Sequence, residues 1–364
     1  MNNNSNEELN HLAFLMAQIG AKEGDIEDQF TLANMYSDGI GVPQDQSQAI
    51  YWWEKAGEQG HLPSISNLAA AYYEGNGVEK DYLRAFNLWK KAAEQGDITS
   101  QFNLAKMYYK GHGVSQDYSQ AIYWWEKAGE QDYDNAQLNL GVMYSNGYGV
   151  EKDYQKAIYW WKKSAKQDNV LAQSYLGHLY FSGENVKQDY SQAFYYLKKA
   201  AKKGHAAAQF TLGMMYYLGY GIKKNYSDAV NLWKQAAKQD NHEAMFRLGN
   251  MYYLGAGVSK DQKKAFDLWE KAFRNGNMTA QYTLYLFNYH RDIAPNDNSQ
   301  PITWFKESAE QDDLKSITTL GQMYLGGITV HINYKLAKEY FKKGCDLGNK
   351  YCCEQYKKLS DKSY

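Results

Sequence analysis

Residues 136–171 read AQLNLGVMYSNGYGVEKDYQKAIYWWKKSAKQDNVL, and this stretch recurs in related form along almost the whole chain. An Asp-Tyr pair begins at residues 81, 117, 153 and 189, so each pair follows the last by 36 residues. Glycines keep the same period at residues 39, 75, 111, 147, 183, 219, 255 and 327. Self-similarity with a fixed period of about 20 to 50 residues is typical of repeat arrays. The sequence therefore predicts one array of 36-residue units instead of separate globular domains.

The period predicts nine units of equal length between two terminal segments. The units are 28–63, 64–99, 100–135, 136–171, 172–207, 208–243, 244–279, 280–315 and 316–351. We expect residues 1–27 to hold a tail and a capping helix, and residues 352–364 a second capping helix and tail, because terminal repeats must cover an apolar face. The eighth unit is degenerate, since residues 292–296 replace its glycine turn and Pro301 replaces an alanine of its second half. A bend or altered packing is expected there.

Each unit is predicted to form two antiparallel helices, A and B, joined by a glycine turn. Ala136, Leu140 and Met143 have the spacing of an amphipathic A helix. The turn glycines supply positive φ angles, and Asp153 is placed to cap helix B. The ten tryptophans fall on two adjacent positions of helix B, at 52, 53, 89, 124, 125, 160, 161, 233, 269 and 304. They exchange with other hydrophobic residues elsewhere, so we interpret them as core residues and not as a ligand-stacking ladder.

The unit resembles the Sel-1-like repeat, a 36-residue relative of the tetratricopeptide repeat. The resemblance rests on the Leu-Gly step at 140–141, 176–177 and 212–213, the Met-Tyr that follows, the Gly-x-Gly-Val turn, and the Ala-x-x-x-Trp of the second half. It covers nearly the whole chain. It implies an all-α, right-handed α/α superhelical solenoid that serves as a non-catalytic adaptor or scaffold, mostly in bacterial or organelle-associated complexes. It also implies that partners bind in the concave groove.

Matching helix A to the tetratricopeptide pattern identifies candidate partner-binding residues on the concave wall. They are Phe102, Lys106, Tyr109, Phe181, Phe210, Met214, Tyr217, Phe246, Asn250, Tyr253, Tyr282 and Tyr289. Aromatic and methionine side chains are enriched at protein interfaces. Asn67, Asn103 and Asn139 form a ladder beside them, and each amide offers a donor and an acceptor to an extended peptide. The alternative is that some of the aromatic residues only pack helix A against its neighbour.

Composition and motifs argue against several other functions. Forty basic and 41 acidic side chains give a formal net charge of −1 with the signs interspersed, which is not typical of proteins that bind nucleic acid or anionic membranes. The histidines lack metal-ligand spacing, the glycine turns follow helices instead of strands, and no Gly-x-Ser-x-Gly motif occurs. We therefore predict a protein or peptide partner, no metal, no cofactor and no catalysis. No signal peptide or membrane span is recognisable, so we expect a cytoplasmic protein.

Two rival functions remain open. One is an immunity or regulatory protein that masks a toxin or an enzyme as a folded domain, a role in which scaffolds of the Sel-1-like family occur. The other, more remote, is a hydrolase of the β-lactam-binding type that has been linked to cysteine-rich relatives. A large hydrophobic contact with a folded partner would favour the first rival, whereas binding of short peptides would favour the groove.

The three cysteines lie near the end of the sequence, at Cys345, Cys352 and Cys353. The eight-residue spacing of Cys345 and Cys353 resembles the spacing with which secreted, cysteine-rich members of the family join consecutive helices. This chain has one such pair and not one per repeat. We therefore interpret the cysteines as reduced thiols that pack as small hydrophobic residues. A disulfide between Cys345 and Cys353 is the alternative.

Overall fold

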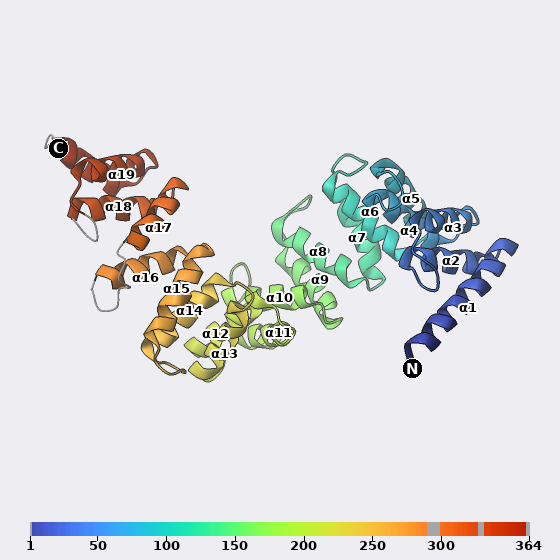
Figure 1. The fold of residues 1–364 in the computed structure, drawn as a ribbon, viewed down its shortest axis with the longest axis horizontal. Helices are drawn as coiled ribbons and strands as arrows, with labels where there is room; N and C mark the ends of the chain where they lie inside the picture. The colour runs from blue at the N-terminus through green and yellow to red at the C-terminus, as the bar shows by residue number, and fades with distance from the viewer. Residues whose placement is uncertain (1, 290–298, 327–330, 362–364) are drawn as a thin grey trace. The chain divides into compact units, whose positions relative to one another are not determined.

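The computed structural model describes residues 2–289, 299–326 and 331–361, and all regular structure in these ranges is helical (Figure 1). An N-terminal helix, α1 (Asn2–Glu23), precedes the helix pairs. The A helices are α2 (Ile26–Asp38), α4 (Leu62–Glu74), α6 (Ile98–Lys110), α8 (Asp134–Asn146), α10 (Val170–Ser182), α12 (Ala206–Leu218), α14 (His242–Leu254), α16 (Met278–Tyr289), α18 (Leu314–Gly326) and α20 (Lys350–Asp361). The B helices are α3 (Gln46–Glu58), α5 (Tyr82–Glu94), α7 (Tyr118–Glu130), α9 (Tyr154–Lys166), α11 (Tyr190–Lys202), α13 (Tyr226–Ala237), α15 (Gln262–Arg274), α17 (Ser299–Glu310) and α19 (Tyr334–Asp346). The predicted all-α repeat fold is confirmed.

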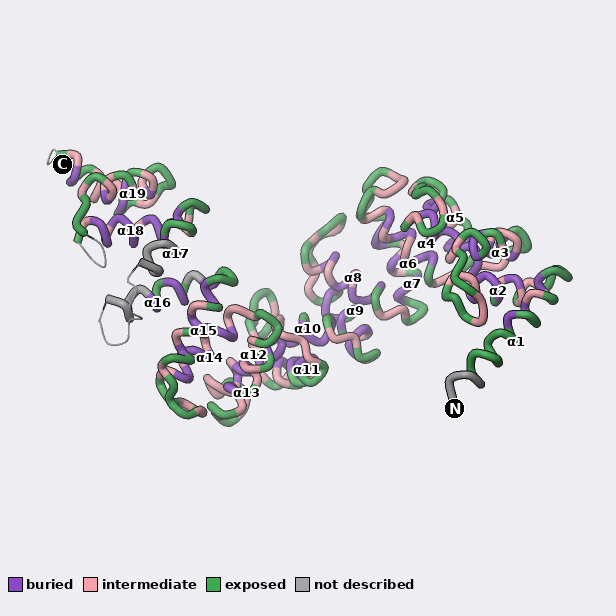
Figure 2. Tube along the Cα trace, viewed as in Figure 1, coloured by how far each residue is buried: buried purple, intermediate pink, exposed green. Residues whose placement is uncertain are grey.

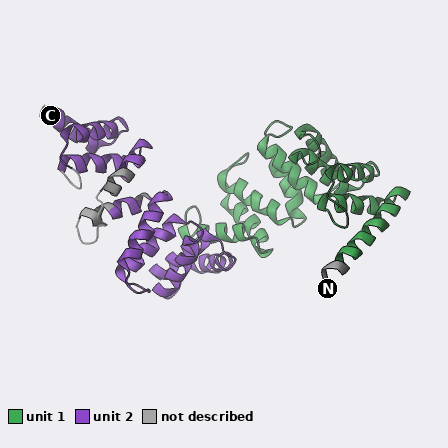
Figure 3. Cartoon of the chain, viewed as in Figure 1, with its two compact units in different colours: residues 1–189 green, residues 190–364 purple. Residues whose placement is uncertain are grey.

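The chain divides into two compact units, residues 1–189 and 190–364 (Figure 3). Within each unit, an A helix packs against the B helix of its own repeat and against the B helix before it, as α8 does with α9 and α7. The A helices begin 36 residues apart, two residues before the predicted start of each repeat. The precise division into nine repeats stays a prediction, and residues 292–296 of the eighth repeat lie outside the described ranges.

Polar side chains cap the start of most helices, although α4 and α8 have no side-chain cap, and left-handed glycines end the A helices from α2 to α14. The Asp117 carboxylate accepts a hydrogen bond from the backbone N–H of Gln120 at 3.0 Å, and Asp153 does the same for Lys156 at 2.9 Å. These contacts confirm the predicted B-helix caps. Gly147 ends α8 in the left-handed conformation, with φ 73°. The bounds of these helices are therefore set by side-chain caps and by left-handed glycines.

The second glycine of each turn is fixed by its contact with the preceding repeat. Gly113 has φ +69°, and a Cβ there would lie 2.3 Å from the carbonyl oxygen of Tyr82, at the start of α5. Gly149 approaches Tyr118, at the start of α7, in the same way. A side chain at Gly113 would require the neighbouring backbone to shift. In the fifth repeat the position is occupied by Asn185, with φ 66°, and asparagine tolerates this conformation better than most residues.

The core lies between the A and B helices, where buried residues line the inner faces (Figure 2). One tryptophan position of helix B is buried throughout, at 53, 89, 125, 161, 233 and 269. In the later repeats the indole lies on a glycine of helix A: a Cβ on Gly213 would come within 2.5 Å of Trp233 Nε1. At the second position Trp160 is buried, whereas Trp124 is half-buried. The interpretation of the described tryptophans as packing residues is confirmed.

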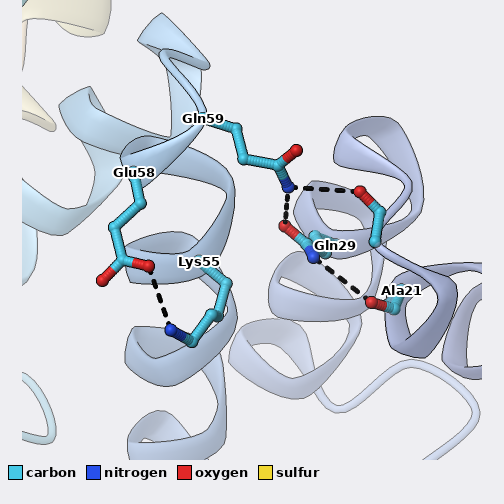
Figure 4. Close-up of polar contacts among 6 residues, drawn as sticks. Ala21, Gln29, Lys55, Glu58 and Gln59 are labelled. Carbon is cyan, nitrogen blue, oxygen red and sulfur yellow. Dashed lines mark hydrogen bonds and ion pairs between the residues drawn. The ribbon is translucent and has the colours of Figure 1, made fainter.

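In several repeats a glutamine joins the A helix to the helices before and after it. The Gln29 amide donates to the carbonyl of Ala21 at 3.2 Å, and Gln59 donates to the Gln29 side-chain oxygen at 2.9 Å (Figure 4). The arrangement recurs around Gln137, which donates to the carbonyl of Gly129 at 2.8 Å and accepts from Gln167 at 3.0 Å. These bonds satisfy buried amides. They also link three consecutive helices by polar contacts that the sequence analysis missed.

The two ends of the array are covered by single helices. Helix α1 buries Phe14, Ala17 and Ala21 and contacts α2. At the other end, Cys345 of α19 and Cys353 of α20 form a disulfide. The expectation that these two thiols are reduced is wrong, because the turn between the helices brings their Cα atoms within 4.5 Å, inside the range that a disulfide bridges. Cys352 is a buried free thiol, as predicted.

Candidate protein-binding surfaces

The asparagine ladder lies at one position of three successive A helices in the first unit. Asn67, Asn103 and Asn139 on α4, α6 and α8 are all half-buried. Asn67 donates to the side-chain oxygen of Asn34 at 3.2 Å, and that oxygen also accepts from Trp53 Nε1 at 3.0 Å. The side-chain amides of Asn103 and Asn139 form no hydrogen bond with any residue that the structure describes. Two of the three amides therefore keep both donors and acceptor capacity available to a ligand.

The predicted aromatic residues of the first unit have a mixed role. The Phe102 ring lies 5.0 Å from the Tyr133 ring, and the Tyr109 ring lies 5.6 Å from Trp125. The Lys106 ammonium lies 5.5 Å from the centre of the Tyr73 ring. These three side chains and Phe181 are half-buried. They contribute to packing between helices, and part of each side chain remains exposed on the surface that the A helices form, which we call the A-helix face.

In the second unit, two predicted tyrosines lie against buried tryptophans. The Tyr217 ring centre is 5.6 Å from that of Trp233, and Tyr253 is 5.7 Å from Trp269. Both tyrosines are half-buried. Their removal would therefore disturb the core as well as any bound partner, which makes them poor probes of binding.

The remaining predicted residues of the second unit differ widely in exposure. The structure corrects the prediction that Phe246 contacts a partner. Its side chain is only 6% exposed and belongs to the core cluster of α13 to α15. Phe210 and Met214 are half-buried and pack against the same cluster. The Asn250 side-chain oxygen accepts from Trp269 Nε1 at 3.0 Å. Tyr282 is 49% exposed. The side chain of Tyr289 lies outside the described residues.

A cavity on the other side of the helices escaped the sequence analysis. It measures about 700 Å³ and lies between α13 and α15, over α14. Its lining includes Lys234, Lys264 and Tyr252. The only signal in the sequence was that neighbouring repeats carry an acidic residue at one of these positions.

In the described part of the chain, no group of three or more His, Cys, Asp or Glu side chains is arranged to hold a metal ion. Among the same residues, no helix combines the length and the apolar character needed to cross a lipid bilayer.

Helix pairs that recur every 36 residues place the chain in the class of α/α repeat solenoids. The model of the Sel1 repeat matches residues 26–61, 63–97, 98–133, 134–169, 170–205, 206–241, 242–277 and 318–349. The chain belongs to the Sel1 repeat family. The degenerate eighth repeat of the prediction falls between the last two matches.

Two solved structures of bacterial Sel1 repeat proteins share the fold. A protective antigen of uropathogenic Escherichia coli is 31% identical, with a TM-score of 0.82 over 94% of this chain and 73% of its own. A Sel1 repeat protein from Oxalobacter formigenes is 29% identical, with a TM-score of 0.69 over 85% of this chain and 90% of its own. An immunity protein from Pseudomonas aeruginosa is 23% identical over 60% of this chain and 86% of its own, but its TM-score of 0.36 carries no functional argument. A search of curated proteins finds no match.

Proposed function

We propose that the chain is a non-catalytic scaffold that binds a protein or peptide segment along the A-helix faces. The observation that carries the proposal is the pair Asn103 and Asn139. They occupy one position on consecutive A helices, and their side-chain amides form no hydrogen bond with a described residue. An extended peptide presents N–H and C=O groups at regular intervals, and amide side chains can pair with both. Sel1 repeat proteins generally mediate protein–protein interactions, which supports this function.

The surfaces beside the ladder would supply the apolar part of the binding energy. In the first unit Phe102, Tyr109 and Phe181 are half-buried, and Lys106 offers a charge. In the second unit the proposed contacts are Phe210, Met214, Tyr217, Asn250, Tyr253 and Tyr282. Partly exposed aromatic side chains in a groove are typical interface anchors. The partner would bury them without a large change in the scaffold.

The proposal can be tested with the asparagine pair. Affinity capture by the intact chain and mass spectrometry would identify a partner, whose affinity is then measured by titration calorimetry. Replacing Asn103 and Asn139 together by Ala should weaken that affinity by roughly tenfold or more, because each lost hydrogen bond contributes about 0.5 to 1.5 kcal/mol. The melting temperature should stay near that of the wild type, since neither amide bonds to another described residue.

The matched control lies on the B helices. Lys127 and Lys163 are on α7 and α9, away from the ladder, and their joint replacement by Ala should leave the affinity within about twofold of the wild type. If the asparagine double variant binds as tightly as the wild type, the ladder is not a contact surface. If both double variants lose binding equally, the effect is not specific to the A-helix face.

A further inference from the structure

The cleft between α13 and α15 combines an apolar floor with a basic rim. Met245, Leu248 and Tyr252 of α14 form the floor, together with Ala237 and Leu268 from the sides. The rim carries five cationic residues and one acidic residue: Lys234, Lys238, Lys264, Lys271, Arg274 and Asp240. A volume of about 700 Å³ is in the usual range of ligand sites. The lining chemistry therefore suits a ligand that is both apolar and anionic.

Most of the rim charge has no carboxylate partner. Arg274 pairs with Glu270 at 2.6 Å. None of the four lysines forms an ion pair with a residue that the structure describes. The ammonium groups of Lys234 and Lys264 lie 5.8 and 4.7 Å from the centre of the same Tyr252 ring. Like charges that share one ring repel each other, and an anion bound between them would remove that repulsion.

Two equivalent clefts in the first unit, at Tyr72 and Tyr144, contain a carboxylate at the position of Lys234. At Tyr72, Glu54 and Arg84 form an ion pair at 3.1 Å. These residues correspond to Lys234 and Lys264, because the repeat places them five periods earlier. The α13–α15 cleft therefore has a lysine where the α3–α5 cleft has a glutamate. One substitution changes a balanced rim into a cationic one.

The cleft at Tyr144 shows the same balance. Glu126 accepts a hydrogen bond from the Tyr144 hydroxyl at 2.8 Å, and the Lys156 ammonium lies 5.0 Å from the ring. Burial and the neighbouring Glu126 raise the pKa of Tyr144 to about 12. In the second unit, the cleft at Tyr216 has Asp228 at the position of Lys264, and this carboxylate contributes, after burial, to the raised pKa of Tyr216. An acid thus holds one of the two positions in the clefts at Tyr72, Tyr144 and Tyr216, and a lysine and a glutamine hold them at Tyr108 and Tyr180, whereas the cleft at Tyr252 has lysine at both.

The floor of the α13–α15 cleft also lacks the glutamine link found in other repeats. One repeat earlier, Gln239 donates to the side-chain oxygen of Gln209 at 3.0 Å. The corresponding residues here are Asn275 and Met245, and their side chains meet only in a 3.8 Å contact between amide nitrogen and sulfur. The shorter amide of Asn275 and the thioether of Met245 thus replace the hydrogen bond between the two glutamines. The result is an open apolar floor below the lysines.

We propose that this cleft binds an acidic amphipathic segment of a partner protein, with apolar side chains on the floor and carboxylates on the rim lysines. The spacing of the cations favours a chain over a small anionic amphiphile. The unpaired Lys264 and Lys271 are seven residues apart on α15, which is about 10 Å along a helix. A single headgroup cannot reach both, whereas acidic residues along a segment can. This site lies between two B helices, over α14, and does not depend on the asparagine ladder.

The direct test uses a fluorescein-labelled peptide of about 14 residues, with Leu and Phe on one helical face and Glu on the other. Its binding to the intact chain is followed by fluorescence anisotropy. The peptide should bind at least about tenfold more tightly than the same peptide with Gln in place of Glu. Raising the salt concentration from about 50 to 300 mM should weaken it several-fold, because the rim is open to solvent. Equal binding of the Glu and Gln peptides would overturn the proposal.

The variant Lys234→Glu introduces the carboxylate that Glu54 and Glu126 supply in the clefts at Tyr72 and Tyr144, so it should fold normally. It should weaken peptide binding about tenfold or more, with an unchanged melting temperature. Lys198→Glu is the matched control, since Lys198 holds the same position on α11 one repeat earlier. The control should bind within about twofold of the wild type. Equal losses in the two variants would mean that net charge, and not this cleft, attracts the peptide. Displacement by dodecanoate at a lower concentration than by unlabelled peptide would assign the cleft to a fatty acid and also overturn the proposal.

Discussion

Individual tryptophans in the repeats fill the same space but make different hydrogen bonds. Trp233 Nε1 donates to the carbonyl of Phe210 at 3.0 Å. Trp53 donates to Asn34. Trp125, although only 3% exposed, has no acceptor for its N–H among the described residues. The residue two repeats after Asn34 is Lys106, and its ammonium group cannot accept a hydrogen bond from Trp125. A buried donor without a partner costs about 1 to 3 kcal/mol.

This difference predicts unequal effects of one substitution at two sites. Replacing Trp233 by Phe removes ring volume and a hydrogen bond, whereas replacing Trp125 by Phe removes the same volume and an unpaired donor. Trp233→Phe should therefore lower the free energy of unfolding by about 1 kcal/mol more than Trp125→Phe. Truncation of Trp125 to Ala should cost roughly 3 to 5 kcal/mol. Urea unfolding followed by circular dichroism measures these values, and equal costs for the two Phe variants would contradict the hydrogen-bond argument.

Among the elements, the turn between helices A and B is more than a flexible connection. Gly113 both adopts a positive φ and lies against the backbone at the start of the preceding B helix. Gly96 also has a positive φ, 95°, but a Cβ there would have no neighbour within 4 Å. A substitution at Gly96 would therefore test the cost of backbone strain alone, whereas one at Gly113 would also test the contact between repeats.

Substitution of these glycines should reveal that contact. Gly96→Ala should cost about 1 to 2 kcal/mol, the usual penalty for a left-handed residue with a side chain. Gly113→Ala should cost at least about 1 kcal/mol more, because its Cβ would have to displace the carbonyl of Tyr82. Differential scanning calorimetry of both variants gives the comparison. A smaller effect at Gly113 would show that the turn can move away from the preceding repeat without cost.

The elements were predictable because their signals are local. The period, the Asp153 cap and the positive φ angles of the turns follow from short stretches of sequence. Burial on the A-helix face was not predictable, as one position shows: Phe246 is buried, Phe210 is half-buried and Tyr282 is exposed. The residues that cover this position come from neighbouring repeats and differ in size. Helical periodicity predicts the direction of a side chain but not how far neighbouring residues bury it.

Contacts across repeats account for the other differences. Gln137 meets partners from both neighbouring B helices, and its importance is visible only once the helices are packed. The α13–α15 cleft likewise depends on Lys234, Tyr252 and Lys264, which come from three helices. Of the candidate binding residues, Asn103 and Asn139 were correctly placed together on successive helices, but their contact with a partner remains a prediction.

For the molecule as a whole, the disulfide is the one covalent link between helices in the described residues. It joins α19 to α20, closing eight residues of chain at the C-terminal end. Replacing Cys345 and Cys353 together by Ser should destabilise the last repeats by about 2 to 3 kcal/mol, the size expected for a short closed loop. Thiol titration of the denatured wild type should find one free thiol, Cys352, before reduction and three after it. Three free thiols before reduction would contradict the pairing.

The constant spacing of the A helices has a consequence for how such a chain can change its length. Removal of residues 98–133 would join Asp97 to Asp134, and Gly149 would then face Tyr82 in place of Tyr118. Both partners are the first residue of a B helix, and both are tyrosines. The new junction would reuse a contact that already exists in the array. Recombination between units can therefore shorten or extend the protein in whole steps without any compensating substitution at the seam.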